Sequence, residues 1–172
     1  MVIPPRVHKT GGPGDWEAEP EMTDAAPERV RSIDDNQDAL LWRLRLIEAA
    51  QEQIILATFD FWDEEGGRDV MGALWNAAER GVEVQVLVDG LNGGGRPLSS
   101  SDLFCQLAAH ENVEVRLYNP LNLLTPWKTN YRMPDKYLIA DDLAYLLAGR
   151  NTAKRFLGRY PDHYNRDRDH LV

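Results

Sequence analysis

The chain alternates between helical and strand patterns, and this alternation constrains its fold more than any other feature of the sequence. Leucine and alanine at helical spacing predict three helices, over about 36–51, 70–80 and 102–109. Short apolar or alternating runs predict three strands, at 54–59, 82–88 and 113–117. Strand–helix repeats of about 30 residues indicate a parallel sheet with right-handed crossovers. The sequence therefore predicts an α/β domain.

Length and composition favour one folded domain preceded by an arm. A chain of 172 residues with 43% hydrophobic residues has enough apolar material for one core. Residues 1–33 are rich in proline, glycine and acidic side chains, so we expect an irregular arm there. Trp16 is the one side chain of the arm suited to docking on the domain. The domain itself is expected to span residues 34–172.

Negative charge is concentrated in the first part of the chain. The formal net charge is −9. Residues 1–110 carry 9 basic and 20 acidic side chains, whereas residues 111–172 carry 10 basic and 8 acidic ones. General nucleic-acid binders hold phosphates with a basic face, so we expect no general nucleic-acid binding. A local pocket for one phosphate group is compatible with this charge.

Cysteine, histidine and glycine usage points away from metal and cofactor chemistry. Cys105 is the single cysteine, so no intrachain disulfide can form, and its apolar helical setting favours a core thiol. Metal-ligand spacing is absent from the four histidines, His8, His110, His163 and His170. The glycine-rich run 90–95 matches neither the dinucleotide fingerprint nor a P-loop. We expect neither a metal nor a cofactor.

Two further patterns bear on location. No apolar run reaches the length of about 18 residues that a transmembrane helix requires. The first residues lack the apolar core of a signal peptide. We therefore expect a protein of the cytoplasm or of the inner face of the membrane.

The most informative stretch for function is residues 130–151. Two apolar runs, 137–140 and 143–148, predict the strands of a hairpin. Lys136 precedes the first strand and Asn151 follows the second, and a cation with an amide donor suits two phosphate oxygens. Asp141, at the turn, would orient a neighbour or make an ordinary turn hydrogen bond. A charged strand end, a turn aspartate and a loop asparagine also occur in domains without a site.

This stretch resembles the signature of the phospholipase D superfamily, His-x-Lys-x4-Asp-x6-Gly-x-x-Asn. Lys136, Asp141 and Asn151 match its lysine, aspartate and asparagine with the required gaps. The segments 39–59 and 74–89, with the run Ala-Ala-Glu-Arg-Gly-Val, resemble the usual approach to that signature. The resemblance covers roughly residues 34–172 and is strongest to bacterial cardiolipin synthase-like or uncharacterised phospholipase D-like proteins. It implies a βαβαβ sheet with helices on both faces, present here as a single half-domain.

The resemblance also implies a chemistry. In the family, two such motifs meet at one site: one histidine attacks phosphorus to form a phosphohistidine, and the other protonates the leaving alcohol. Lysines and asparagines hold the phosphate oxygens, and no metal is needed. Water as the acceptor gives hydrolysis, and an alcohol gives transfer. The implied partners are a phospholipid or other phosphodiester and a second motif-bearing half, or a homodimer partner.

Three positions depart from the family pattern. Pro134 stands where the nucleophilic histidine belongs, and proline carries neither a nucleophile nor a backbone N–H. Ala148 stands at the glycine position, where its methyl group would crowd the phosphate. Only one motif is present, so we expect a truncated or half protein. His163 and His170 follow the motif and are the candidates to replace the missing nucleophile.

Several functions remain compatible with these departures. The chain would be half of a phosphatidyl transferase or phosphodiesterase that is inactive alone, with Lys136, Asp141 and Asn151 as its catalytic set. It would otherwise be a non-catalytic module that binds phosphate or an anionic headgroup through Lys136 and Asn151, or a degenerate product. A nuclease-type phosphodiesterase is the further enzymatic alternative.

Overall fold

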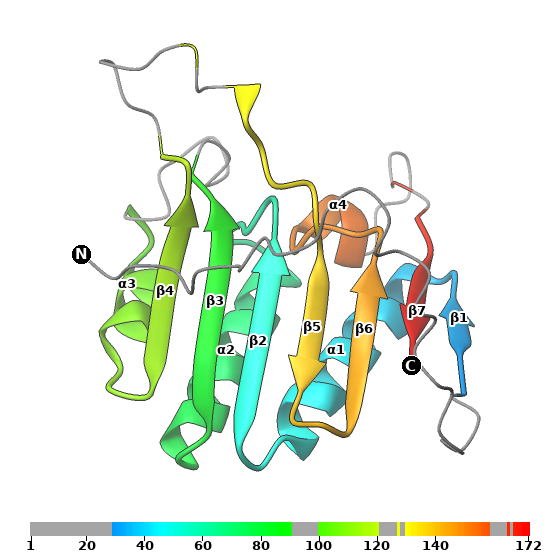
Figure 1. Cartoon of the computed structure of the whole chain (residues 1–172), viewed down its shortest axis with the longest axis horizontal. Helices are drawn as coiled ribbons and strands as arrows, with labels where there is room; N and C mark the ends of the chain where they lie inside the picture. Colours follow the sequence, from blue (N-terminus) through cyan, green and yellow to red (C-terminus); the bar gives the residue numbers. More distant parts are fainter. Residues whose placement is uncertain (1–28, 91–99, 121–126, 128–129, 159–164, 166) are drawn as a thin grey trace, which may run out of the picture.

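The computed structural model describes residues 29–90, 100–120, 127, 130–158, 165 and 167–172. Its elements are β1 (Arg31–Ile33), α1 (Asn36–Ala49), β2 (Gln53–Thr58), α2 (Gly67–Glu79), β3 (Glu83–Asp89), α3 (Asp102–Ala109), β4 (Val113–Tyr118), β5 (Tyr137–Ala140), β6 (Ala144–Ala148), α4 (Lys154–Leu157) and β7 (Asp169–Leu171). The strands form one seven-stranded sheet in the order β1-β7-β6-β5-β2-β3-β4 (Figure 1). The predicted α/β class is confirmed.

One half of the sheet is parallel and the other is antiparallel. β2 pairs parallel with β3, and β3 pairs parallel with β4, as the helix–strand alternation predicts. β5 pairs antiparallel with β2, and the predicted hairpin of β5 and β6 is present. The expectation of a parallel sheet is thus correct for only three strands. The chain reaches β5 at the carboxyl end of β2, so β5 has to run in the opposite direction.

The three longer helices, α1, α2 and α3, lie side by side behind the sheet (Figure 1). The expectation of helices on both faces is therefore wrong for these helices. β2, β3 and β4 follow one another in a single direction across the sheet. Successive right-handed crossovers between such strands place their helices on the same face. The apolar side chains of this helical layer pack on alternate residues of the strands, such as Val84, Val86 and Val88.

Local sequence explains where the helices begin and end. Asp35 caps α1 by accepting hydrogen bonds from the backbone N–H groups of Gln37 and Asp38, at 2.8 and 3.0 Å. Ser101 caps α3 in the same way. After α2, Gly81 adopts a φ of 90°, a left-handed conformation that glycine tolerates at a helix end. Caps of this kind satisfy the backbone groups that a helix leaves free at its ends.

The folded domain begins slightly earlier than expected. Arg31–Ile33 forms strand β1, which pairs antiparallel with β7, and the Ile33 side chain is buried in the core. Three residues assigned to the arm therefore belong to the sheet. Residues 1–28, including Trp16, lie outside the described part of the chain, as does the glycine-rich run 91–95. Cys105 is exposed on α3, so the prediction of a core thiol is wrong.

A buried ion cluster joins helix α1 to the β1–β7–β6 side of the sheet. The Asp169 carboxylate on β7 contacts Arg43 Nη1 of α1 at 2.8 Å and Arg150 Nη1 at 3.3 Å. All three side chains are almost completely buried. Arg150 also donates to the carbonyl oxygen of Ile33 and to Asn36 Oδ1. Burial lowers the pKa of the Arg43 guanidinium, and the neighbouring Asp169 opposes that effect. One carboxylate therefore connects α1, β1, β6 and β7.

Asp141 has a structural position at the opposite end of the hairpin from Lys136. Its carboxylate accepts hydrogen bonds from the backbone N–H groups of Gln51, Glu52 and Gln53, at 2.8 to 2.9 Å. These bonds lower the pKa of Asp141. The residue has a φ of 50°, which aspartate tolerates in a tight turn. Asp141 therefore fastens the β5–β6 turn to the connection between α1 and β2.

No helix in the described residues is both long and apolar enough to cross a membrane.

We expect Asp141→Ala to lower the free energy of unfolding by about 1 kcal/mol, because three backbone amides, one of them partly buried, lose a charged acceptor. Denaturant unfolding at neutral pH measures this difference. Because these hydrogen bonds hold the pKa of Asp141 below its usual value in the folded state, the stabilisation is present at any pH above that usual value. It is lost as the pH falls through the folded-state pKa. Asp142→Ala is the matched control, since Asp142 is exposed beside it; equal losses in both variants would contradict this role.

We expect Asp169→Asn to destabilise the protein by about 3–5 kcal/mol, because two buried guanidinium groups lose their shared counter-charge. Thermal or denaturant unfolding measures the loss. Asp34→Asn is the control, because Asp34 pairs with Arg168 at an exposed position, where an ion pair contributes at most about 1 kcal/mol. An Asp169→Asn protein as stable as the unaltered chain would show that the cluster does not hold the sheet together.

Candidate functional site

Polar residues from three parts of the chain meet at one edge of the sheet. The carboxyl ends of β2, β3 and β6 and the start of β5 all reach the upper edge in Figure 1. Lys136 precedes β5 and Asn151 follows β6, so the hairpin brings both to this edge, as the sequence predicts. Asp60 follows β2 and Asp89 ends β3 at the same edge.

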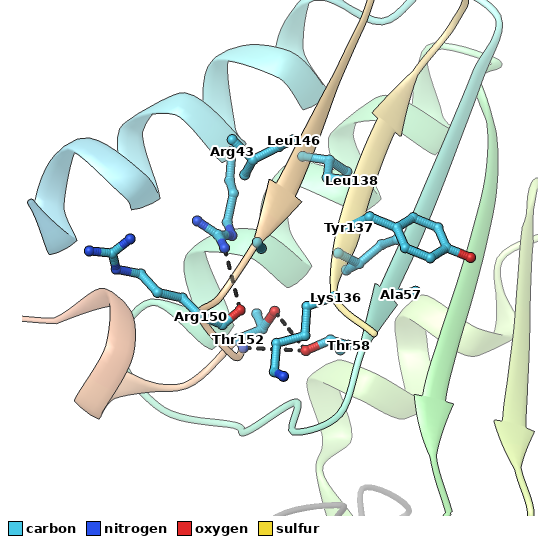
Figure 2. A pocket seen from close by; sticks show the side chains of 11 residues that line it. Arg43, Ala57, Thr58, Lys136, Tyr137, Leu138, Leu146, Arg150 and Thr152 are labelled. Atoms are coloured by element: carbon cyan, nitrogen blue, oxygen red, sulfur yellow. Dashed lines mark hydrogen bonds between the residues drawn. The ribbon is translucent and has the colours of Figure 1, made fainter. Parts of the chain in front are cut away.

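Lys136 lines a small cavity between β2, β5 and β6. Figure 2 shows its side chain beside the hydroxyl groups of Thr58 and Thr152. The cavity measures about 10 Å³, near the lower limit for one water molecule. Lys136 Nζ donates to the carbonyl oxygen of Pro134 at 2.7 Å. The ammonium group therefore lies next to the position where the family pattern has its nucleophile.

Asn151 is buried against the loop that follows β2. Only 7% of the residue is exposed. Its Oδ1 accepts from the backbone N–H of Asp60 and its Nδ2 donates to Asp60 Oδ2, both at 3.4 Å. The segment after β6 is fixed to the same loop, because Thr152 N donates to the Asp60 carbonyl oxygen at 3.0 Å. These bonds determine where the Asn151 amide points.

Asp60 is a carboxylate that the sequence analysis did not include in the site. Arg155 Nη2 lies 3.1 Å from its Oδ2. Burial raises the pKa of Asp60, an effect that Arg155, the Trp62 indole and, more weakly, Lys136 oppose. The Trp62 Nε1–H is buried and makes no hydrogen bond of normal geometry to any described residue, although it is near enough to affect this pKa. Asp60 is therefore the group to which Asn151, Arg155 and Lys136 are all close.

Asp89 holds the segment that leads into the motif. Its buried carboxylate pairs with Arg132 Nη1 at 2.9 Å and accepts from the backbone N–H of Met133 at 3.2 Å. Met133 is the residue before Pro134, so Asp89 fixes the chain immediately before the nucleophile position. Asp89 ends the segment 74–89 that contributed to the family resemblance, but the sequence gives no indication of what its carboxylate contacts.

The nucleophile position itself is exposed and carries no reactive group. Pro134 precedes β5, where a residue without a backbone N–H breaks no ladder hydrogen bond. Of the two histidines that follow the motif, His170 lies on β7, two strands from β5, with its Nδ1 3.2 Å from Ser32 Oγ. His163 lies outside the described residues. In the part of the chain that the structure describes, no cluster of residues suited to a metal ion occurs.

The third predicted site residue is not at this edge. Asp141 lies at the far end of β5, five extended residues and roughly 17 Å from Lys136. Its carboxylate is already bound by backbone amides. The carboxylate of Asp141 therefore lies away from this edge. It binds the backbone of a segment 88 to 90 residues distant in the chain, so its contacts are neither with a group of the site nor within its own turn. Ala148 ends β6 and lines the cavity beside Lys136. This edge of the sheet carries the Lys136 cation and the Asn151 amide donor, and position 134 carries no nucleophile.

Comparison with known proteins places this site in a family. Residues 44–162, more than half of the chain, match the family model described as "Cardiolipin synthase, PLD-like domain". Cardiolipin synthase C of Escherichia coli K12 is 33% identical over 135 residues, which are 73% of this chain. Cardiolipin synthase B of the same strain is 34% identical over 118 residues, 67% of this chain. The chain spans only 28% of the length of either relative.

Solved structures show the same fold at low sequence identity. NucT from Helicobacter pylori superposes with a TM-score of 0.63 at 22% identity, over 83% of this chain and 84% of that one. Phosphatidylserine synthase from Haemophilus influenzae gives a TM-score of 0.66 at 17% identity, over 83% of this chain and 32% of that one. The family match, the curated relatives and the shared fold agree with the spacing of Lys136 and Asn151. The chain belongs to the phospholipase D superfamily, as a cardiolipin synthase-type PLD-like domain.

Proposed function

We propose that the chain is a phospholipase D-like half-domain that binds the phosphodiester of a phospholipid and does not turn it over alone. The observation that carries the proposal is the convergence of Lys136 and Asn151 at the sheet edge beside Pro134. An ammonium and an amide N–H₂ are suited to two non-bridging phosphate oxygens. Proline at position 134 supplies no nucleophile to form the phosphohistidine on which the family's chemistry depends.

A second motif-bearing half is the partner that this proposal requires for turnover. That half would come from another chain or from a second copy of this one, across a two-fold axis. A half from another chain would supply one of the two histidines that the family's reaction uses, whereas a second copy of this chain would bring the same proline. In either case Lys136 and Asn151 would hold the phosphate, and position 134 would still lack its histidine. The protein would act in the cytoplasm or at the inner face of the membrane, where the phosphodiesters of phospholipids are accessible.

The hypothesis of a non-catalytic binding module uses the same site but includes no reaction of the bound phosphate. For the chain alone, Pro134 favours this hypothesis, because it supplies no nucleophile. A nuclease-type phosphodiesterase would use the same phosphate contacts on nucleic acid, and the net charge of −9 weighs against it. The buried ion cluster and the closely bonded loops at the sheet edge weigh against a degenerate product without a site.

We expect inorganic phosphate and a soluble glycerophosphodiester to shift the NMR signals of Lys136 and Asn151. Lys136→Ala and Asn151→Ala should each weaken binding about tenfold or more, since each removes a hydrogen bond to a charged group. Lys154→Ala is the matched control, because it removes the same charge at α4, where Nζ pairs with Glu65. Binding that is unchanged in Lys136→Ala and Asn151→Ala would exclude this phosphate site.

We expect Pro134→His to restore phosphodiester cleavage, but only when the chain is mixed with a second motif-bearing half from a two-motif member of the family. Loss of a nucleophile typically lowers kcat by about 10⁶-fold, so the unaltered chain in the same mixture should show almost no activity. Release of the alcohol from a glycerophosphodiester measures the rate. Equal activity in the two mixtures, or no activity in the mixture that contains Pro134→His, would contradict the assignment of position 134 as the nucleophile position.

A further inference from the structure

We propose that the Asp60 carboxylate is an internal competitor for the phosphate, occupying the Asn151 amide with which this half-site would bind it. The inference rests on the proposed function, because it concerns the same site. It assigns a specificity role to a residue that lies outside the motif. The argument uses the position of Asp60, the groups it occupies and the charge it introduces.

The backbone at Asp60 is fixed on several sides. Thr58 Oγ1 donates to its carbonyl oxygen at 2.8 Å and Thr152 N donates to the same oxygen at 3.0 Å. The following residue, Phe61, forms a parallel bridge with Thr152. The loop then passes so close to α2 that a Cβ on Gly67 would lie 1.9 Å from the Trp62 carbonyl oxygen. Only glycine fits there, so the loop has little freedom to carry Asp60 away.

The carboxylate occupies one donor of the proposed site, the Asn151 amide, and also the neighbouring Arg155 guanidinium. Its Oδ2 accepts from Asn151 Nδ2 at 3.4 Å and pairs with Arg155 Nη2 at 3.1 Å. The residue is only 5% exposed, whereas the Arg155 side chain is 51% exposed. The Arg155 guanidinium lies over the rings of Trp62 and Phe156, at 5.6 and 5.3 Å from their centroids. Arg155 is thus held in position and accessible, with its charge directed at Asp60.

Because both are negatively charged, Asp60 and a phosphate compete for these donors. A phosphodiester at Asn151 and Lys136 would place a second negative charge beside a buried carboxylate, and like charges at an interface cost several kcal/mol. Burial already raises the pKa of Asp60, so this environment disfavours the charged carboxylate even without a ligand. Replacing the carboxylate with an amide removes the repulsion and leaves only a neutral acceptor to compete with the phosphate for Asn151 and Arg155.

The test compares Asp60→Asn with the unaltered chain by NMR titration with inorganic phosphate and with a soluble glycerophosphodiester. We expect Asp60→Asn to bind about tenfold tighter or more. Asp63→Asn is the matched control: it removes the same charge from the same loop, where Asp63 pairs with Arg68, and should leave binding unchanged. Asp60→Ser provides a second variant without the charge, and thermal unfolding checks that both variants fold.

The outcomes separate this inference from the proposed function. Tighter binding in Asp60→Asn that is lost in the double variant Asp60→Asn, Asn151→Ala supports the inference, and the probe with the larger gain distinguishes free phosphate from a headgroup diester. Equal phosphate binding by the unaltered chain and both Asp60 variants would overturn the inference and leave the phosphate site intact. Absence of phosphate binding in the unaltered chain and in both Asp60 variants would overturn both this inference and the proposed function. A gain that persists without the Asn151 amide would also overturn the inference.

Discussion

The buried cluster of Arg43, Asp169 and Arg150 is the interaction on which the rest of the structure depends. It brings two guanidinium groups to one carboxylate inside the core, where an unpaired charge would be strongly destabilising. Asp169 Oδ1 also accepts from the backbone N–H groups of Gly149 and Arg150. These are the two residues before Asn151. The cluster therefore joins α1 to the last strands of the sheet and also fixes the chain that carries the amide of the site.

The motif has two ends with different physical roles. At one end of the β5–β6 hairpin, Lys136 and Asn151 face the edge where β2 and β3 also end. At the other end, Asp141 binds three backbone amides and joins the hairpin to the connection that precedes β2. A residue in the family signature can thus be required for the fold without contacting the ligand. Loss of Asp141 would move the strand that carries Lys136, so its effect on the site would be indirect.

Sequence patterns predicted what depends on local spacing. The alternation of β3, the helical spacing of α2 and the hairpin of β5 and β6 follow from periodicity, and the hairpin is what brings Lys136 and Asn151 to one edge. The contacts of Asp60 were not predictable in this way, because Asn151 and Arg155 lie 91 and 95 residues from it. The hydrogen bond from Met133 N to the Asp89 carboxylate joins residues 44 positions apart, and it was not predictable for the same reason. The contacts of Asp141 were not predicted, because spacing locates a turn aspartate but does not identify the backbone amides that it binds.

We propose that the edge of the sheet between Lys136 and Asn151 binds a phosphate within this acidic protein, and that the Asp60 carboxylate weakens this binding. A crystal structure of the chain with Asp60→Asn, grown in the presence of a glycerophosphodiester, tests the proposal. We expect phosphate density within hydrogen-bond distance of Lys136 Nζ and Asn151 Nδ2, beside Pro134. Phosphate bound elsewhere, with this edge unchanged, would contradict it.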